Sequence, residues 1–400
     1  MTAQAPSSLL AILLIFLRLG LTSFGGPVAH LAYFRAEFVE RRRWLDEHAY
    51  ADLVALCQFL PGPASSQVGM ALGLSRAGIP GAVAAFLGFT LPSAILLALF
   101  ALGVARFGSQ VDGGWLHGLK VVAVAVVAQA LWGMGRSLAA DRQRATLAVA
   151  SAALVTAVPS ALGQIGAIAG CGIVGWYFLR TDAALPHSAV PVPVKRSTGA
   201  LLLAGFFVIL FALPLLAQGT GAYALKLFDG FYRSGALVFG GGHVVLPLLQ
   251  SVVVPAGWVS NDAFLAGYGA AQAVPGPLFT FAAYLGAIST GSPSGWTGAA
   301  IASVAIFLPA FLLVAGAMPF WDGLRRHAGI KRAMLGVNAG VVGLLLAAFY
   351  HPVWTGAIQG ATDLALAATA YLLLVFWRWP PWLVVILAAL VTGVGFPAAA

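Results

Sequence analysis

Long stretches of apolar residues, separated by short polar or Gly/Pro-rich breaks, dominate the chain. Nine such runs lie at 80–103, 119–135, 145–158, 162–179, 198–217, 297–319, 334–350, 361–377 and 382–396. A helix needs about 20 predominantly apolar residues to cross a bilayer, and most of these runs approach that length. The shorter runs would have to pair or to pack deep inside the protein. The pattern therefore predicts an all-α polytopic membrane protein.

Composition and charge support a membrane protein. Of the 400 residues, 60% are hydrophobic and 8% are charged, which is more apolar surface than a water-soluble domain can bury. The formal net charge is +9, and its basic residues lie in short loops such as Arg41 to Arg43, Arg142 and Arg144, and Lys195 and Arg196. This placement follows the positive-inside rule. The lipid bilayer is thus the expected partner, and no nucleic acid is expected.

Several kinds of chemistry are not expected. Cys57 and Cys171 lie in apolar segments without ligand-type neighbours, so we expect no disulfide, no metal and no cofactor. The N-terminal stretch carries no basic residue or cleavage pattern typical of a removable signal peptide. The chain lacks a GxxxxGK[ST] phosphate loop and any soluble segment large enough for another nucleotide site. Its acidic residues are dispersed, which argues against an enzyme.

The chain repeats itself at an offset of about 214 residues. The first copy reads RLGLTSFGGPVAH and then WLDEHAYADLVALCQFLPGP, and the second reads RSGALVFGGGHVV and then WVSNDAFLAGYGAAQAVPGP. Generic likeness between apolar sequences would not align arginine, FGG, tryptophan, glutamine and PGP in one order. We predict a first half at 1–180 and a second half at 223–400. The segment 181–222 between them would hold a cytoplasmic loop and a linking transmembrane helix.

Loop charges indicate how the two halves are oriented. The loop at 35–47 carries four arginines, whereas the matching loop at 250–262 carries no Lys or Arg. Conversely, the loop at 104–118 has one arginine, and its counterpart at 321–332 contains Arg325, Arg326, Lys331 and Arg332. Because basic loops stay in the cytoplasm, the halves are predicted to be inverted-topology repeats. The helix at 198–217 supplies the odd crossing that inversion requires.

Discontinuous helices are predicted at the FGG and PGP motifs. If every apolar run were a full crossing, the basic residues at 136–144 would lie outside. That conflict disappears if re-entrant hairpins form at 8–40 and 50–76 from the cytoplasm, and at 225–255 and 262–290 from the outside. Gly tolerates a sharp break and Pro cannot donate the helical hydrogen bond. Irregular backbone at membrane depth needs cover from protein or a water-filled cavity, so the tips are the predicted binding region.

The broken helices suit an anion, because a helix N-terminus presents free N–H groups and the positive end of the dipole. The candidate substrate-binding residues are two arginines, two glutamines, one serine and the tip triplets: Arg18, Ser23, Phe24, Gly25, Gly26, Gln58, Pro61, Gly62, Pro63, Arg233, Phe239, Gly240, Gly241, Gln272, Pro275, Gly276 and Pro277. A basic residue in an apolar stretch is expensive unless it pairs or functions. Each arginine could instead snorkel to the interface, and each glutamine could cap freed carbonyls.

Other polar residues lie near the tips. Ser65 and Ser66 could donate hydrogen bonds to an oxyanion, although serine is common where membrane helices pack. His30 and His243 could relay protons or simply pack. No carboxylate is expected deep in a crossing, because the aspartates of the apolar regions fall near segment starts: Asp52, Asp229, Asp262 and Asp363. The energy source for transport therefore stays open.

Five strings carry a family resemblance. FLRLGLTSFGGP at 16–27, RRRWLDEHAYADLVALCQFLPGP at 41–63, GFTLPSA at 88–94, FGGGHVVLP at 239–247 and QAVPGP at 272–277 closely resemble the chromate ion transporter family in its long, two-domain form. The resemblance covers nearly the whole chain. In the second copy, Gly242-His243 replaces Pro27-Val28, so the halves are not expected to contribute identically to a site.

The resemblance implies a function. It implies a secondary active transporter in the bacterial inner membrane that exports chromate, is driven by the proton-motive force and confers chromate resistance. Sulfate, a close structural analogue of chromate, would compete or serve as an alternative substrate. A transporter of another small anion, or an anion channel, is the alternative. A homodimer is the expected assembly.

Overall fold

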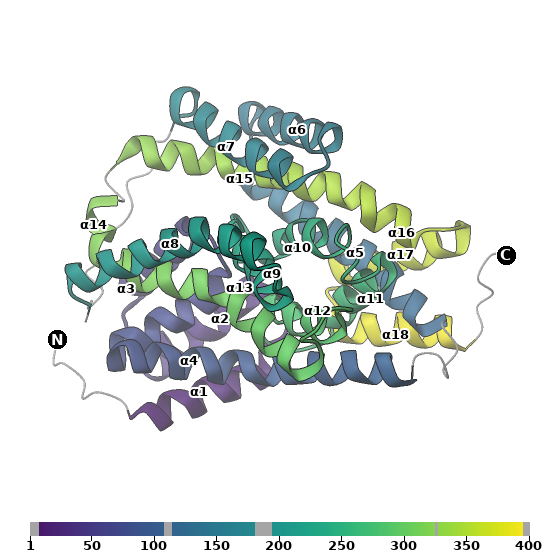
Figure 1. The fold of residues 1–400 in the computed structure, drawn as a ribbon, viewed down its shortest axis with the longest axis horizontal. Coiled ribbons are helices and arrows are strands. Elements are labelled where there is room, and N and C mark those ends of the chain that lie inside the picture. The colour runs from purple at the N-terminus through teal and green to yellow at the C-terminus, as the bar shows by residue number, and fades with distance from the viewer. Residues whose placement is uncertain (1–7, 108–113, 181–193, 325–326, 395–400) are drawn as a thin grey trace.

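The computed structural model describes residues 8–107, 114–180, 194–324 and 327–394, and every regular element in these ranges is a helix (Figure 1). The first half contains α1 (Leu9–Thr22), α2 (Gly26–Arg35), η1 (Ala36–Arg41), α3 (Glu47–Phe59), α4 (Ala64–Phe107), α5 (Gly114–Leu138), α6 (Arg142–Ala157) and α7 (Ala161–Phe178). The predicted all-α class is confirmed for the described residues.

The remaining elements belong to the linking helix and the second half. They contain α8 (Arg196–Thr220), α9 (Tyr223–Ala236), η2 (Gly242–Val244), α10 (Val245–Val253), α11 (Asn261–Ala271), η3 (Leu278–Thr280), α12 (Phe281–Ile288), α13 (Gly295–Ala317), η4 (Met318–Phe320), α14 (Trp321–Leu324), α15 (Ala328–Ala348), η5 (Phe349–Trp354), α16 (Thr355–Ala357), α17 (Ala361–Val375) and α18 (Pro381–Gly393). Arg325 and Arg326, which carry part of the charge argument, lie outside the described residues.

Among the described residues, six helical segments are long and apolar enough to cross a membrane: Ala64–Arg106, Gly114–Leu138, Ala161–Phe178, Arg196–Thr220, Gly295–Leu324 and Ala328–Ala357. They account for six of the nine predicted runs. The other three runs form the shorter helices α6, α17 and α18, of 16, 15 and 13 residues. The chain is thus a multi-pass membrane protein.

Helices end and begin again at each FGG and PGP motif. The FGG motif separates α1 from α2 in the first half and α9 from η2 and α10 in the second. The PGP motif likewise separates α3 from α4, and α11 from η3 and α12. Gly62 and Gly276 have φ angles of 125° and 99°, a left-handed region that side chains rarely adopt. We call the breaks at 23–25 and 237–241 the FGG tips, and those at 60–63 and 272–277 the PGP tips.

The two halves exchange their C-terminal helices. The pair α6 and α7 packs on α15 of the second half, and α17 and α18 pack on α5 of the first (Figure 1). Both contacts depend on glycine. A methyl group at Gly175 would lie 2.5 Å from the carbonyl oxygen of Arg332, and one at Gly118 would lie 2.5 Å from that of Ala388. The last two helices of each half are therefore packed as a pair against a long helix of the opposite half.

Candidate functional site

The PGP tip of each half is hydrogen-bonded to the FGG tip of the other half. The backbone N–H of Gly62 donates to the carbonyl of Val238 over 2.7 Å, and the backbone N–H of Gly276 donates to the carbonyl of Ser23 over 2.9 Å. Gly62 and Gly276 are repeat equivalents, and so are Ser23 and Val238. The four tips thus meet in two reciprocal pairs, which brings together sequence motifs that are up to 250 residues apart.

Each PGP glycine also packs against the opposite half's long helix, one residue after its internal proline. A methyl group at Gly62 would lie 3.0 Å from Cβ of Ala310, which follows Pro309 in α13. One at Gly276 would lie 2.8 Å from Oγ of Ser93, which follows Pro92 in α4. No side chain fits between tip and helix at either place.

Buried polar groups surround the FGG tip of the first half. His30 of α2 is 1% exposed, and its Nε2 lies 3.2 Å from the carbonyl of Ser23. A carbonyl only accepts, so Nε2 carries the proton, and Nδ1 then accepts from the hydroxyl of Ser65 over 3.3 Å. The carbonyl of Ser23 therefore accepts two hydrogen bonds, one from the imidazole of His30 and one from the backbone N–H of Gly276.

Four further polar atoms in this region are buried without a hydrogen-bond partner: Ser23 Oγ, Ser66 Oγ, Gln67 Oε1 and Thr90 Oγ1. An unpaired buried polar group costs roughly 1–3 kcal/mol, so such atoms mark places where water or a polar solute would be stabilised. The side-chain nitrogen of Gln67 is already used, since it donates to the carbonyl of Pro61 in the PGP tip over 2.8 Å.

The second half replaces most of this polar cluster with apolar residues, although Ser66 is matched by Thr280. The positions equivalent to Ser23, His30, Ser65, Gln67, Thr90 and Ser93 are occupied by Val238, Val245, Phe279, Phe281, Phe307 and Ala310. All six of these replacements are buried. The backbone contacts at the tips are thus repeated in both halves, whereas most of the polar side chains of this cluster occur only in the first.

The two predicted arginines have different surroundings. Arg18 lies on the exposed surface of α1. Arg233 is partly buried on α9 and forms an ion pair with Asp229, a residue 5% exposed. The expectation that Asp229 lies near a segment start is wrong, because it is the seventh of the 14 residues of α9. The Asp-x-x-x-Arg spacing was the available signal, since residues four apart share one helix face.

The remaining predicted residues are spread around the tips. Gln58 is exposed on α3, whereas the side-chain nitrogen of Gln272 is buried without a partner. Among the tip residues, Gly62, Pro63, Pro275 and Pro277 are buried, Gly25 is exposed, and those of intermediate exposure are Phe24, Gly26, Pro61, Phe239, Gly240, Gly241 and Gly276. Methyl groups at Gly240 and Gly241 would face Leu138 and Met134 of α5.

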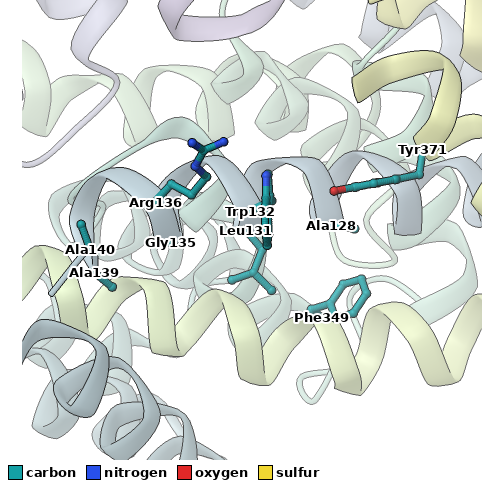
Figure 2. Close-up of a pocket in the computed structure, with 9 residues that line it drawn as sticks. All are labelled: Ala128, Leu131, Trp132, Gly135, Arg136, Ala139, Ala140, Phe349 and Tyr371. Carbon is teal, nitrogen blue, oxygen red and sulfur yellow. The ribbon is translucent and has the colours of Figure 1, made fainter. Parts of the chain in front are cut away.

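An open pocket of about 530 Å³ lies on another side of α5, outside the predicted site. Figure 2 shows Tyr371 of α17 extending across it toward Trp132, with Phe349 on the opposite wall. Arg136 is its one charged lining residue. Because the lining is otherwise almost entirely apolar, this pocket suits an oxyanion less well than the tips do.

No group of three or more metal-ligating side chains occurs among the described residues. Two ion pairs near the start of α5 join it to other helices. His117 lies 2.7 Å from Asp363 of α17, and Lys120 lies 3.1 Å from Asp262 of α11. These pairs tie the first half's α5 to the second half and are separate from the tips.

The chain is similar in sequence to known transport proteins. The chain is 32% identical to a chromate transport protein of Pseudomonas aeruginosa over 347 residues, covering 82% of this chain and 77% of the relative. It is 26% identical to one of Cupriavidus metallidurans over 406 residues, covering 98% and 95%. An uncharacterized transporter of Methanocaldococcus jannaschii is 27% identical over 348 residues, covering 85% and 83%. No solved structure matches the chain significantly.

The family match covers both halves. The chain matches the chromate transporter family at residues 10–176 and again at 225–394, and these segments include all four tips. The resemblance carried by the FGG and PGP strings is thereby confirmed. The relatives are transport proteins rather than enzymes. This protein belongs to the chromate transporter family.

Proposed function

We propose that this protein is a secondary active transporter that exports chromate across the bacterial inner membrane, is driven by the proton-motive force, and gives chromate resistance. The observation that carries the proposal is the reciprocal hydrogen bonding of the FGG and PGP tips between the halves. Two such pairs, each between opposite halves, form a centre that rocking of one half against the other would open to one side and then the other.

The tips offer the groups that an oxyanion needs. Helices α2 and α4 begin at the tips of the first half, and η2 with α10 begins at the FGG tip of the second. Their N-termini supply free N–H groups and positive dipole ends. The buried hydroxyls of Ser23, Ser66 and Thr90 have no partner and add donors. Neutral donors of this kind suit a tetrahedral dianion such as chromate, and they suit sulfate as its competitor.

The membrane potential supplies enough energy for export. Moving one charge through 100 mV is worth about 2.3 kcal/mol, and an anion leaving a negative interior gains this amount for each charge. A dianion would therefore gain about 4.6 kcal/mol per 100 mV.

The proposed topology keeps the inverted repeats and the re-entrant hairpins. In this topology the linking helix α8 supplies the odd crossing. Its exposed apolar side chains suit that place, since Leu201, Phe211 and Leu215 are 72%, 68% and 72% exposed and would face lipid or a second copy in a homodimer. Ser75→Cys and Ser292→Cys, each in a chain without Cys57 and Cys171, test the topology by labelling with a membrane-impermeant thiol reagent. Ser75→Cys should react from the cytoplasm and Ser292→Cys from the periplasm. The reverse pattern would refute inverted halves.

The function is tested by accumulation of radiolabelled chromate in energised everted vesicles. We expect accumulation that excess sulfate reduces and a protonophore abolishes. Because Arg233 is partly buried beside the tips and Arg18 is exposed, Arg233→Ala should lower accumulation more than Arg18→Ala. Accumulation no greater than in vesicles without the protein would rule out chromate, and accumulation unaffected by the protonophore would rule out the driving force.

A further inference from the structure

An ion pair lies on α9, beside the FGG tip of the second half. Asp229 and Arg233 are one helical turn apart, and Arg233 precedes the first residue of the motif, Phe239, by six positions. The side chain of Asp229 is buried and that of Arg233 is 39% exposed, and a partly buried ion pair adds little net stability, because desolvation offsets the attraction. Helix α9 is not itself a candidate span but packs on the spans α8 and α13, and ionisable residues inside such a bundle are rare and mark ion or proton pathways. The pair is therefore better explained by function than by folding.

The hydrogen bonding of this pair is incomplete. Arg233 donates to Oδ2 of Asp229, while Oδ1 of Asp229 and Nε of Arg233 are buried and have no partner. Leaving charged groups unsatisfied is costly, so a pair that served only to fix the helix would be expected to satisfy them. The free Oδ1 is a position for a proton, and the free N–H of Arg233 is a position for an oxyanion.

The surroundings leave the pair without another counterion. Helices α8, α10 and α13 pack on α9. Neither α10 nor α13 contains a charged or titratable residue. The one such residue in α8 is Arg196, at its first position. Helix α8 meets α9 where the carbonyl of Phe206 accepts from Tyr232, ten residues or about 15 Å of helix beyond Arg196.

The titratable residues nearest in sequence form no ion pair with Asp229 or Arg233. Lys226 of α9 is exposed, and Nδ1 of His243 in η2 is hydrogen-bonded to the hydroxyl of Tyr268 over 2.8 Å. The first half has no equivalent pair, because the positions matching Asp229 and Arg233 hold Leu14 and Arg18, both exposed. The ion pair is thus a single feature of the second half, opposite the polar cluster of the first.

We propose that Asp229 couples proton binding to oxyanion binding by controlling Arg233. When the carboxylate is ionised it holds the guanidinium. When a proton from water adds to Oδ1, the attraction is lost, and the guanidinium turns to the oxyanion at the tips. No bond of the oxyanion changes in this step. The inference rests on the proposed function and gives the sign of its coupling: proton and oxyanion bind together and cross in the same direction.

With this sign the membrane-potential part of the proton-motive force drives export, and a pH gradient that is acidic outside opposes it. A dianion that leaves with a proton carries a net charge of minus one, and a negative interior still favours its exit by about 2.3 kcal/mol per 100 mV. The coupling also lets acidity inside the cell promote binding of the anion. Because binding energies are linked reciprocally, the anion must equally promote protonation of Asp229.

The test follows protons and chromate together. Purified protein is reconstituted in liposomes that contain a trapped pH-sensitive dye, with the membrane potential clamped, and chromate is added outside at a pH where it is a dianion. For the wild type we expect chromate to enter and the lumen to acidify, with a proton for each anion. Asp229→Asn should still exchange labelled chromate across the membrane but should lose the acidification.

Two variants serve as controls. Asp141→Asn makes the same chemical change at an exposed aspartate in the turn before α6 and should acidify the lumen like the wild type. Asp229→Glu keeps a carboxylate and should still acidify the lumen. It provides a second test of the carboxylate if Asp229→Asn proves unstable. Wild-type entry without acidification, or acidification of unchanged size in Asp229→Asn, would overturn the proposal. Absence of chromate entry in the wild type would instead refute the proposed function.

Discussion

Gly276→Ala is the sharpest test of the tip contacts. The new methyl group would lie 2.8 Å from Oγ and 3.3 Å from Cβ of Ser93, and 3.4 Å from the carbonyl oxygen of Phe89. The φ angle of 99° adds a backbone penalty of about 1–2 kcal/mol for a residue with a side chain. Overpacking adds about 1–3 kcal/mol. We expect the free energy of unfolding to fall by about 2–5 kcal/mol in total. Chromate transport should also be lost, because the N–H of Gly276 would no longer reach the carbonyl of Ser23.

The matched control is Gly257→Ala. Gly257 also has a positive φ, 69°, but a methyl group there would meet no atom within 4 Å. Gly257→Ala should therefore lower the free energy of unfolding only by the backbone penalty, about 1–2 kcal/mol, and should keep chromate transport. The double change Gly276→Ala with Ser93→Ala removes the nearest clashing atom and should recover part of the loss. Thermal midpoints in detergent and chromate uptake measure both effects. Equal losses in Gly276→Ala and Gly257→Ala would refute close packing at the tip.

Three further predictions concern other contacts. His30→Leu removes the imidazole between the Ser65 hydroxyl and the Ser23 carbonyl, and should lower the free energy of unfolding by about 1–3 kcal/mol; an unchanged thermal midpoint would contradict this. Gly118→Val should separate α5 from α18 and raise protease sensitivity, and full resistance would count against the helix exchange. Asp141→Ala removes the α6 cap and should cost about 1 kcal/mol, seen as a lower thermal midpoint. The backbone N–H and guanidinium of Arg144 lower the pKa of Asp141, so this contribution is present above the unfolded pKa, and the difference from wild type should shrink as pH falls through the folded pKa.

The sequence predicts the positions of the helix breaks well, because Gly and Pro mark them directly. It predicts the repeat equally well, because Gly62 and Gly276 recur with their neighbours. It does not predict that each PGP tip meets the FGG tip of the other half. The groups that meet are the backbone N–H of a glycine and the carbonyl of Ser23 or Val238. Backbone groups are nearly the same in every residue, so the sequence does not show which of them are hydrogen-bonded.

Two features of the site were missed for different reasons. The sequence places Asp229 at a segment edge, because α9 includes Lys226 and Arg233 and so does not stand out as an apolar run, although the spacing from Asp229 to Arg233 is visible. The polar cluster around His30 was seen only as scattered residues. Ser65 belongs to α4 and is 35 positions away along the chain, so its contact with the imidazole depends on how the two helices pack.

The exchange of helices between the halves has a consequence for biosynthesis. The first half is complete in the chain when α7 ends at residue 178, but its packing partner α15 begins only at residue 328. Ribosomes add about 5–20 residues per second, so these 150 residues take roughly 8–30 s to make. During that time the faces of α6 and α7 that pack on α15 are without their final neighbour. The nascent first half must wait in the membrane as an unfinished intermediate, protected by lipid or by an insertion factor, until the second half arrives.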